Sequence, residues 1–123
     1  MNLTQQITHF GEYPLINLSA EELRKIIIKQ FNPKSNSFNF QTFTTNNILS
    51  YLKDNNLGLI IPPNTTYTGG LNKGDCSRAR EIIWDLIIER YLTIGSYGED
   101  SWPNFSITER GHAYFKEFNN STI

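Results

Sequence analysis

The chain has 123 residues, of which 38% are hydrophobic and 19% charged, and its formal net charge is -1. This composition is typical of one globular domain that buries its own core. The near-neutral charge gives no broad basic field toward nucleic acid or membranes, and the single cysteine, Cys76, excludes an internal disulfide and a cysteine-based metal site. No apolar run approaches a membrane span and residues 1–15 lack signal-peptide features. The sequence therefore predicts a cytoplasmic protein without membrane contact.

The first expected element is a helix that follows an N-terminal arm. Residues 1–18 show no clean periodicity, and we expect the arm there. Ser19 and Glu22 have the spacing of a capping box, in which each side chain bonds the free amide of the other residue. Apolar residues continue at helical spacing up to Pro33, which prevents the helix from continuing. We expect this helix over residues 20–31.

The middle of the chain predicts a short strand, a second helix and an insertion. Residues 35–41 alternate apolar and polar side chains, which is typical of a half-buried strand. A second helix is expected from about Thr44 to Asp54, with Thr44 or Thr45 as its N-cap. The insertion over residues 55–74 contains an apolar triplet that suits a brief strand, and Pro-Pro and Gly-Gly pairs that are typical of a loop.

A long third helix is expected from a cap at Asp75 or Ser77 to about Tyr91. Its apolar residues cover more than one face, so we expect most of its sides to be buried. The remaining polar stripe predicts an exposed side. That stripe consists of Arg78, Glu81, Asp85 and Glu89.

The last part of the chain predicts a β-hairpin followed by a helix. Residues 92–96 and 102–107 suit two strands, and the polar stretch between them suits a loop. Thr108 can cap a final helix over residues 109–118. Residues 119–123 are expected to form a tail.

From Asp75 onward the sequence resembles the winged-helix superfamily, in particular bacterial regulators of that superfamily. Residues 83–92 (IWDLIIERYL) resemble its third helix running into the first wing strand. Residues 105–111 (FSITERG) resemble the LTExG turn that closes the wing. The order of the expected elements agrees with that topology. The resemblance implies an α+β, mostly helical winged-helix domain over residues 19–118, with a three-helix core, a β-hairpin wing and a C-terminal helix.

The resemblance implies DNA binding in transcription regulation, with the third helix in the major groove and the wing on phosphates. The candidate DNA contacts are the side chains at the start of that helix, namely Lys73, Ser77, Arg78 and Arg80. The charge of this part of the chain opposes the hypothesis. Residues 74–118 carry five basic and eight acidic side chains, whereas contacts with phosphates supply most non-specific affinity for DNA.

The alternative is a protein–protein interaction module within a larger protein or complex, built on the same fold without DNA binding. Tyr97 and Trp102 are its candidate anchors, because aromatic side chains are enriched at interfaces. The competing interpretation of Trp102, and of Trp84, is that they complete the core. Dimerisation of the chain with itself is a further expectation from the resemblance. Residues 60–73 of the insertion are a further candidate for the specialised part of such a module, because loops often carry function.

The sequence predicts no enzyme, metal or cofactor. His9 and His112 stand in unrelated contexts, and no His, Asp and Glu grouping has metal-ligand spacing. Cys76 is expected at a helix N-terminus, which can lower a thiol pKa, but a structural role is favoured because no basic partner is predicted beside it. Residues 68–74 contain glycines and a lysine without the spacing of a phosphate-binding loop.

Overall fold

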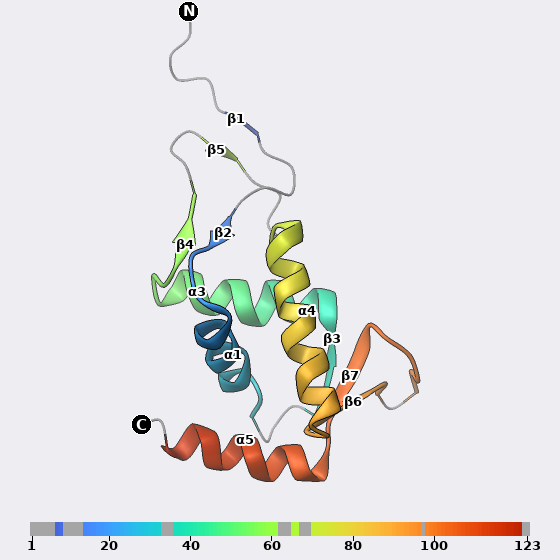
Figure 1. Cartoon of the computed structure of the whole chain (residues 1–123). Coiled ribbons are helices and arrows are strands. Elements are labelled where there is room, and N and C mark those ends of the chain that lie inside the picture. The colour runs from blue at the N-terminus through green and yellow to red at the C-terminus, as the bar shows by residue number, and fades with distance from the viewer. Residues whose placement is uncertain are drawn as a thin grey trace, which may run out of the picture.

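The computed structural model describes residues 7–8, 14–32, 36–61, 65–66, 70–96 and 98–121, and the statements below refer to these residues. They form an α+β fold in which a small antiparallel sheet lies at one side of the helices (Figure 1). The elements are β1 (Ile7–Thr8), β2 (Leu15–Ile16), α1 (Ala20–Lys29), β3 (Ser37–Asn39), α2 (Phe40–Thr42), the π-helix η1 (Phe43–Leu49), α3 (Ser50–Asp54), β4 (Leu59–Ile60), β5 (Thr65–Thr66), α4 (Lys73–Ile88), β6 (Leu92–Ile94), β7 (Asn104–Ile107) and α5 (Glu109–Ser121).

The capping box predicted the start of α1 correctly. The Ser19 hydroxyl accepts a hydrogen bond from the Glu22 amide at 3.1 Å, and the Ser19 amide donates to the Glu22 carboxylate at 3.0 Å. Two of the four amides left free at a helix start are thereby satisfied. The helix ends at Lys29, two residues earlier than expected, and its inner face is fully buried at Leu23 and Ile27.

The second helical region begins earlier than the sequence predicted. The Asn39 side chain caps it, because its oxygen accepts hydrogen bonds from the amides of Gln41 at 3.1 Å and Thr42 at 3.3 Å. The predicted cap at Thr44 or Thr45 is therefore wrong. Thr44 is buried, and its hydroxyl donates to the Gln41 carbonyl oxygen at 2.8 Å. Because α2, η1 and α3 follow one another without a break, helical structure continues up to Asp54, where the second helix was expected to end.

The central sheet has three antiparallel strands in the order β3-β7-β6. Ser37 of β3 lies opposite Ser106 of β7, and Leu92 of β6 lies opposite Ile107. The predicted hairpin and the predicted strand between the first two helices are thus confirmed, with shorter strands. Thr108 follows the hairpin and its hydroxyl accepts a hydrogen bond from the Gly111 amide at 2.9 Å, which confirms the predicted cap of α5.

The segment before α1 and the insertion after α3 pair with each other. Strand β2 is antiparallel to β4, with Leu15 opposite Ile60, and β1 is parallel to β5. The Asn17 amide donates a hydrogen bond to the Gly58 carbonyl oxygen at 2.6 Å. The brief strand predicted in the insertion is confirmed. Residues 14–18 of the expected arm are packed against the fold, and Ile16 belongs to the core. In Figure 1, β2 and β4 lie beside the start of α4 and β1 and β5 lie above it, all of them away from the hairpin.

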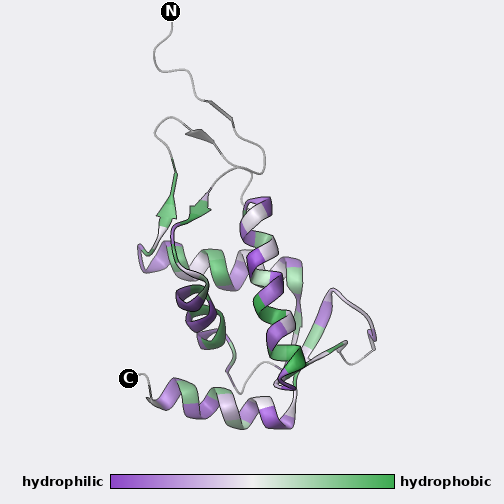
Figure 2. Ribbon diagram, in the orientation of Figure 1, coloured by the Kyte–Doolittle hydropathy of each residue, from purple (hydrophilic) through white to green (hydrophobic). Residues whose placement is uncertain are grey.

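Aromatic rings occupy the centre of the core. The Phe31 ring is stacked on the rings of Phe43 at 5.2 Å and Phe115 at 4.8 Å, and it meets Phe105 edge-on at 6.3 Å between centroids. Stacked and edge-on ring pairs add stability beyond the apolar area that they bury. These contacts join the end of α1 to η1, β7 and α5. Figure 2 shows the apolar residues that accompany them as green segments of the helices and strands.

Gly111 permits the close contact between α5 and the residue before the hairpin. A Cβ atom at this position would lie 1.9 Å from the Tyr91 carbonyl oxygen and 2.9 Å from its carbonyl carbon. Both atoms belong to the backbone, so neither can move without moving β6. A glycine is therefore required at position 111 by space.

We expect Gly111→Ala to lower the free energy of unfolding by about 3 kcal/mol or more, because α5 must shift away from Tyr91. Gly70→Ala is the matched control, since nothing lies within 4 Å of a Cβ atom at Gly70. Urea denaturation of both variants measures the effect. Equal unfolding midpoints for the two variants would contradict this explanation.

Candidate binding surface

Helix α4 begins two residues before the earlier of the two predicted caps. Its N-cap is Asn72, whose side-chain oxygen accepts a hydrogen bond from the Asp75 amide at 2.9 Å. The prediction of Asp75 or Ser77 as the cap is therefore wrong. Asp75 lies in the first turn instead, and only 5% of its surface is exposed. A buried carboxylate requires hydrogen-bonded or charged partners.

Asn72, Asp75 and Arg78 form a group that we name the polar clamp. The Asp75 carboxylate accepts hydrogen bonds from the Ile16 amide at 2.8 Å, from Arg78 at 3.2 Å and from the Asn72 side-chain amide. The same Asn72 amide donates to the Pro14 carbonyl oxygen at 2.9 Å. The polar clamp thus holds the segment around β2 against the first turns of α4.

Arg78 is used inside the molecule. Besides its ion pair with Asp75, its guanidinium donates to the carbonyl oxygens of Ile16, at 3.4 Å, and Leu18. About a third of its side chain is exposed, so it belongs only in part to the exposed stripe predicted for this helix. A DNA contact by Arg78 would compete with these three acceptors. The sequence around Arg78 could not predict these carbonyl partners, because they lie about 60 residues earlier in the chain.

We expect Asp75→Ala to destabilise the fold by about 3 kcal/mol, because it leaves the Ile16 amide and the Arg78 guanidinium without their buried acceptor. Chemical denaturation measures this loss, and hydrogen exchange of the Ile16 amide reports it locally. Asp85→Ala, an exposed acid on the same helix, is the control. Similar stabilities of the two variants would show that the polar clamp contributes little.

The other three candidate DNA contacts share the exposed side of α4. Lys73, Ser77 and Arg80 are exposed and follow one another along its first half. The Arg80 guanidinium lies over the Phe40 ring, 5.9 Å from its centroid. The structure therefore brings three of the four candidates to one face and holds the fourth in the polar clamp.

Apolar side chains dominate the second half of the same face. Trp84 is 36% exposed and Ile88 is 75% exposed, and they lie one helical turn apart. The Trp84 ring is 5.6 Å from the ring of Trp102, which is half-buried and 6.0 Å from Phe105. Ile94, 38% exposed, is opposite Phe105 in the hairpin, and residues directly opposite in antiparallel strands point to the same face.

We name Trp84, Ile88, Ile94 and Trp102 the α4–hairpin surface. Of the two aromatic anchors proposed from the sequence, Trp102 is part of it, although three rings also pack against this side chain. Tyr97 lies outside the described residues. Ile88 and Ile94 were missed. The apolar residues of α4 cover more than one face, from which we expected most sides of the helix to be buried. That expectation is wrong, because Trp84 and Ile88 are exposed.

Cys76 is half-buried in the first turn of α4. Burial raises the pKa of its thiol, and the nearby Asp75 carboxylate acts in the same direction, while Arg80 opposes it. The thiol also contacts the Leu71 carbonyl oxygen, at 3.7 Å. A raised pKa is the opposite of what activates a cysteine nucleophile, so these surroundings favour a structural role.

We expect Cys76 to react with iodoacetamide more slowly than glutathione at pH 7 to 8, because less of it is thiolate and part of it is covered. Labelling rates across this pH range measure the difference, and labelling in urea supplies the unfolded reference. A folded protein that reacts faster than free glutathione would instead support a reactive cysteine.

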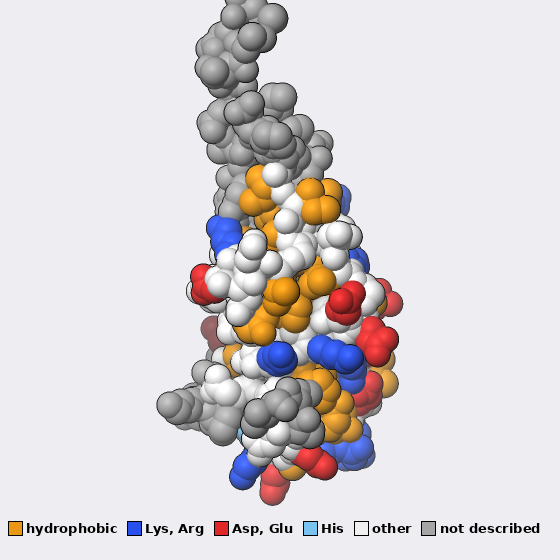
Figure 3. Space-filling model, turned by 90° about the vertical axis from the view of Figure 1, so that its left-hand side faces the viewer, with side chains coloured by type: hydrophobic (Ala, Val, Ile, Leu, Met, Phe, Trp, Pro, Cys, Tyr) orange, Lys and Arg blue, Asp and Glu red, His pale blue; other side chains and the backbone are white. Residues whose placement is uncertain are grey.

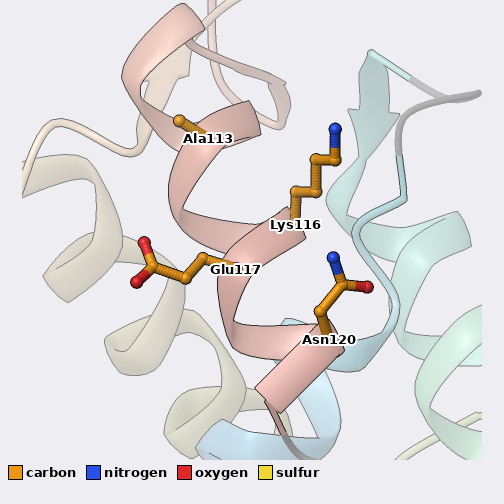
Figure 4. Close-up of a pocket in the computed structure, with 4 residues that line it drawn as sticks. All are labelled: Ala113, Lys116, Glu117 and Asn120. Carbon is orange, nitrogen blue, oxygen red and sulfur yellow. The ribbon is translucent and has the colours of Figure 1, made fainter.

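Two shallow pockets lie away from the α4–hairpin surface. The first runs along the outer side of α5, where Ala113, Lys116, Glu117 and Asn120 come from successive turns of one helix (Figure 4). The second lies between the end of α3 and β4, on the side seen in Figure 3, where exposed apolar side chains are mixed with charged ones. An enzyme site commonly combines an acid, a base and a nucleophile. The described residues that line these two pockets do not include such a combination.

Comparison with models of protein families, with curated proteins and with solved structures finds no match to this chain. Within the described part of the chain, no three His, Cys, Asp or Glu side chains are grouped to hold a metal ion. None of the described helices is long and apolar enough to cross a membrane.

Proposed function

We propose that this chain is a winged-helix domain that binds a protein partner through the α4–hairpin surface. The order of α1, β3, the second helical region, α4, the β6–β7 hairpin and α5 supports the winged-helix assignment, as does the strand order β3-β7-β6. In this assignment α4 is the third helix of the core, β6 and β7 form the wing and the pairing of β2 with β4 is an addition to the fold.

The exposure of Ile88 and Trp84 is the observation that carries the proposal. Neither side chain belongs to the buried core cluster or to the partly buried residues packed against it, and both are exposed. Clustered apolar side chains on a small domain mark interaction sites, and tryptophan is enriched among the residues that dominate binding energy. Trp102 and Ile94 extend the same surface onto the hairpin.

DNA is the second candidate partner. The exposed side chains of Lys73, Ser77 and Arg80 on the first half of α4 favour it, because the N-terminal half of a recognition helix commonly contacts bases and phosphates. Glu81 and Asp85 on the same face would repel phosphates. Arg78 is paired within the polar clamp, so its positive charge is not presented at this candidate interface.

Site-specific crosslinking tests the protein-binding proposal. We expect a photoreactive phenylalanine analogue at Ile88 to give a discrete crosslink to another protein in cells that express the chain. The same analogue at Lys25, exposed on α1, is the control and should give none of that product. A product that forms equally from both positions, or no product from Ile88, would contradict the proposal.

Fluorescence anisotropy with a labelled mixed-sequence duplex tests the DNA candidate. If DNA binds α4, Arg80→Ala should weaken binding more than Lys25→Ala and should reduce the slope of log affinity against log salt by about 1, because one phosphate contact is lost. Absence of binding even at low salt, or equal losses in the two variants, would exclude this mode of DNA recognition.

A further inference from the structure

Both elements that carry the α4–hairpin surface also carry exposed acidic side chains. Glu81 and Asp85 are exposed beside Trp84 on α4, and Glu99 and Asp100 are exposed in the loop of the hairpin. The antiparallel bridge between Ser96 and Glu99 holds that loop at the end of the hairpin. The apolar side chains of the surface therefore have negative charges both along the helix and on the hairpin.

Two acids elsewhere on the helices, Glu89 and Glu21, have basic partners. Glu89, at the end of α4, pairs with Arg24 at 3.0 Å, and Glu21 is 4.0 Å from Lys25. Among the described residues, Glu81, Asp85, Glu99 and Asp100 form no ion pair of this kind. Their charges are thus available to a partner, and a partner that brings positive charges would gain both attraction and faster association.

We infer that the α4–hairpin surface binds a basic amphipathic helix of a partner protein, with apolar side chains on one face and Lys or Arg at its margins. This inference rests on the proposed function. Trp84 and Ile88 are one turn apart on α4, which suits the spacing of anchors on a helix that packs alongside. The same acids disfavour nucleic acid at this half of the helix.

Two basic side chains, Lys73 and Arg80, lie on the first half of this face, and Arg80 is the one nearer Trp84 along the helix. It lies over Phe40 at the end of the surface nearer the start of α4. A positive side chain there is attracted to the carboxyl end of a bound helix, where the backbone dipole is negative. The partner helix would accordingly place its carboxyl end beside Arg80 and its basic margins beside Glu81 and Asp85.

Selection from a displayed library of 16-residue helices tests the inference. The library has a constant leucine face and either Lys or Glu at the margins, and the intact chain is the target. Trp84 and Trp102 are the only tryptophans, so their emission reports binding directly. We expect selected peptides to carry Lys margins and to shift this emission to shorter wavelength.

Charge reversal identifies the residues responsible. We expect the double variant Glu81→Lys with Asp85→Lys to weaken binding of the Lys-margin peptides at least tenfold and to favour the Glu-margin peptides. The double variant Glu21→Lys with Asp54→Lys changes the net charge equally at distant exposed positions and should leave the preference unchanged. An unchanged preference in the first variant, or the same loss in both, would overturn the inference.

Ile88→Asp separates failure of the inference from failure of the proposed function. Peptides that bind regardless of their margins, and are lost in Ile88→Asp, would leave the protein-binding surface intact and overturn the basic preference. Peptides that bind Ile88→Asp as well as the unchanged chain would overturn both. Sedimentation that shows a dimer of the chain, dissociated by Ile88→Asp, would replace the basic helix with a second copy as the occupant.

Discussion

The stacking of aromatic rings around Phe31 is the interaction on which the rest of the fold depends. Phe31 stands at the end of α1, and its neighbours Phe43, Phe105 and Phe115 come from η1, β7 and α5. Segments from the first third, the middle and the last part of the chain thus meet at one ring. These rings occupy the centre of the core, and α4 packs against the core through the apolar side chains of its inner face. The apolar residues on the outer side of α4 do not take part in this packing, and we propose that they bind a partner protein.

The two halves of α4 consequently have different roles. Its first turn is fixed by the polar clamp, in which Asp75 and Arg78 bind the backbone around β2. The positive charge of Arg78 is therefore paired inside the molecule, whereas a DNA-binding helix would present such a charge to phosphate. Its second half presents Trp84 and Ile88 next to the hairpin, flanked by acids. Both the charges and the exposed apolar side chains of α4 support our proposal of a protein partner in preference to DNA.

Local signals predicted much of the fold from the sequence. Three features were predicted correctly: the capping box at Ser19, the alternation in the hairpin and the cap at Thr108. Each depends on residues only a few positions apart, so the local sequence is enough to predict it. The caps at Asn39 and Asn72 were missed because Thr44 and Asp75 are equally good cap residues, and tertiary packing decides between such candidates. The buried partners of Arg78 lie about 60 residues away, and the exposure of Ile88 depends on how the whole core is filled. Neither can be obtained from periodicity alone.

The division of α4 into a core side and a binding side is the central claim, and the free energies of unfolding of two isoleucine variants test it most directly. Ile83 is fully buried, whereas Ile88 is 75% exposed on the same helix. The account predicts that Ile83→Ala lowers the free energy of unfolding by about 2 to 5 kcal/mol and that Ile88→Ala changes it by less than about 0.5 kcal/mol. A loss for Ile88→Ala comparable to that for Ile83→Ala would contradict the account, because it would place Ile88 in the core and remove it from the proposed surface.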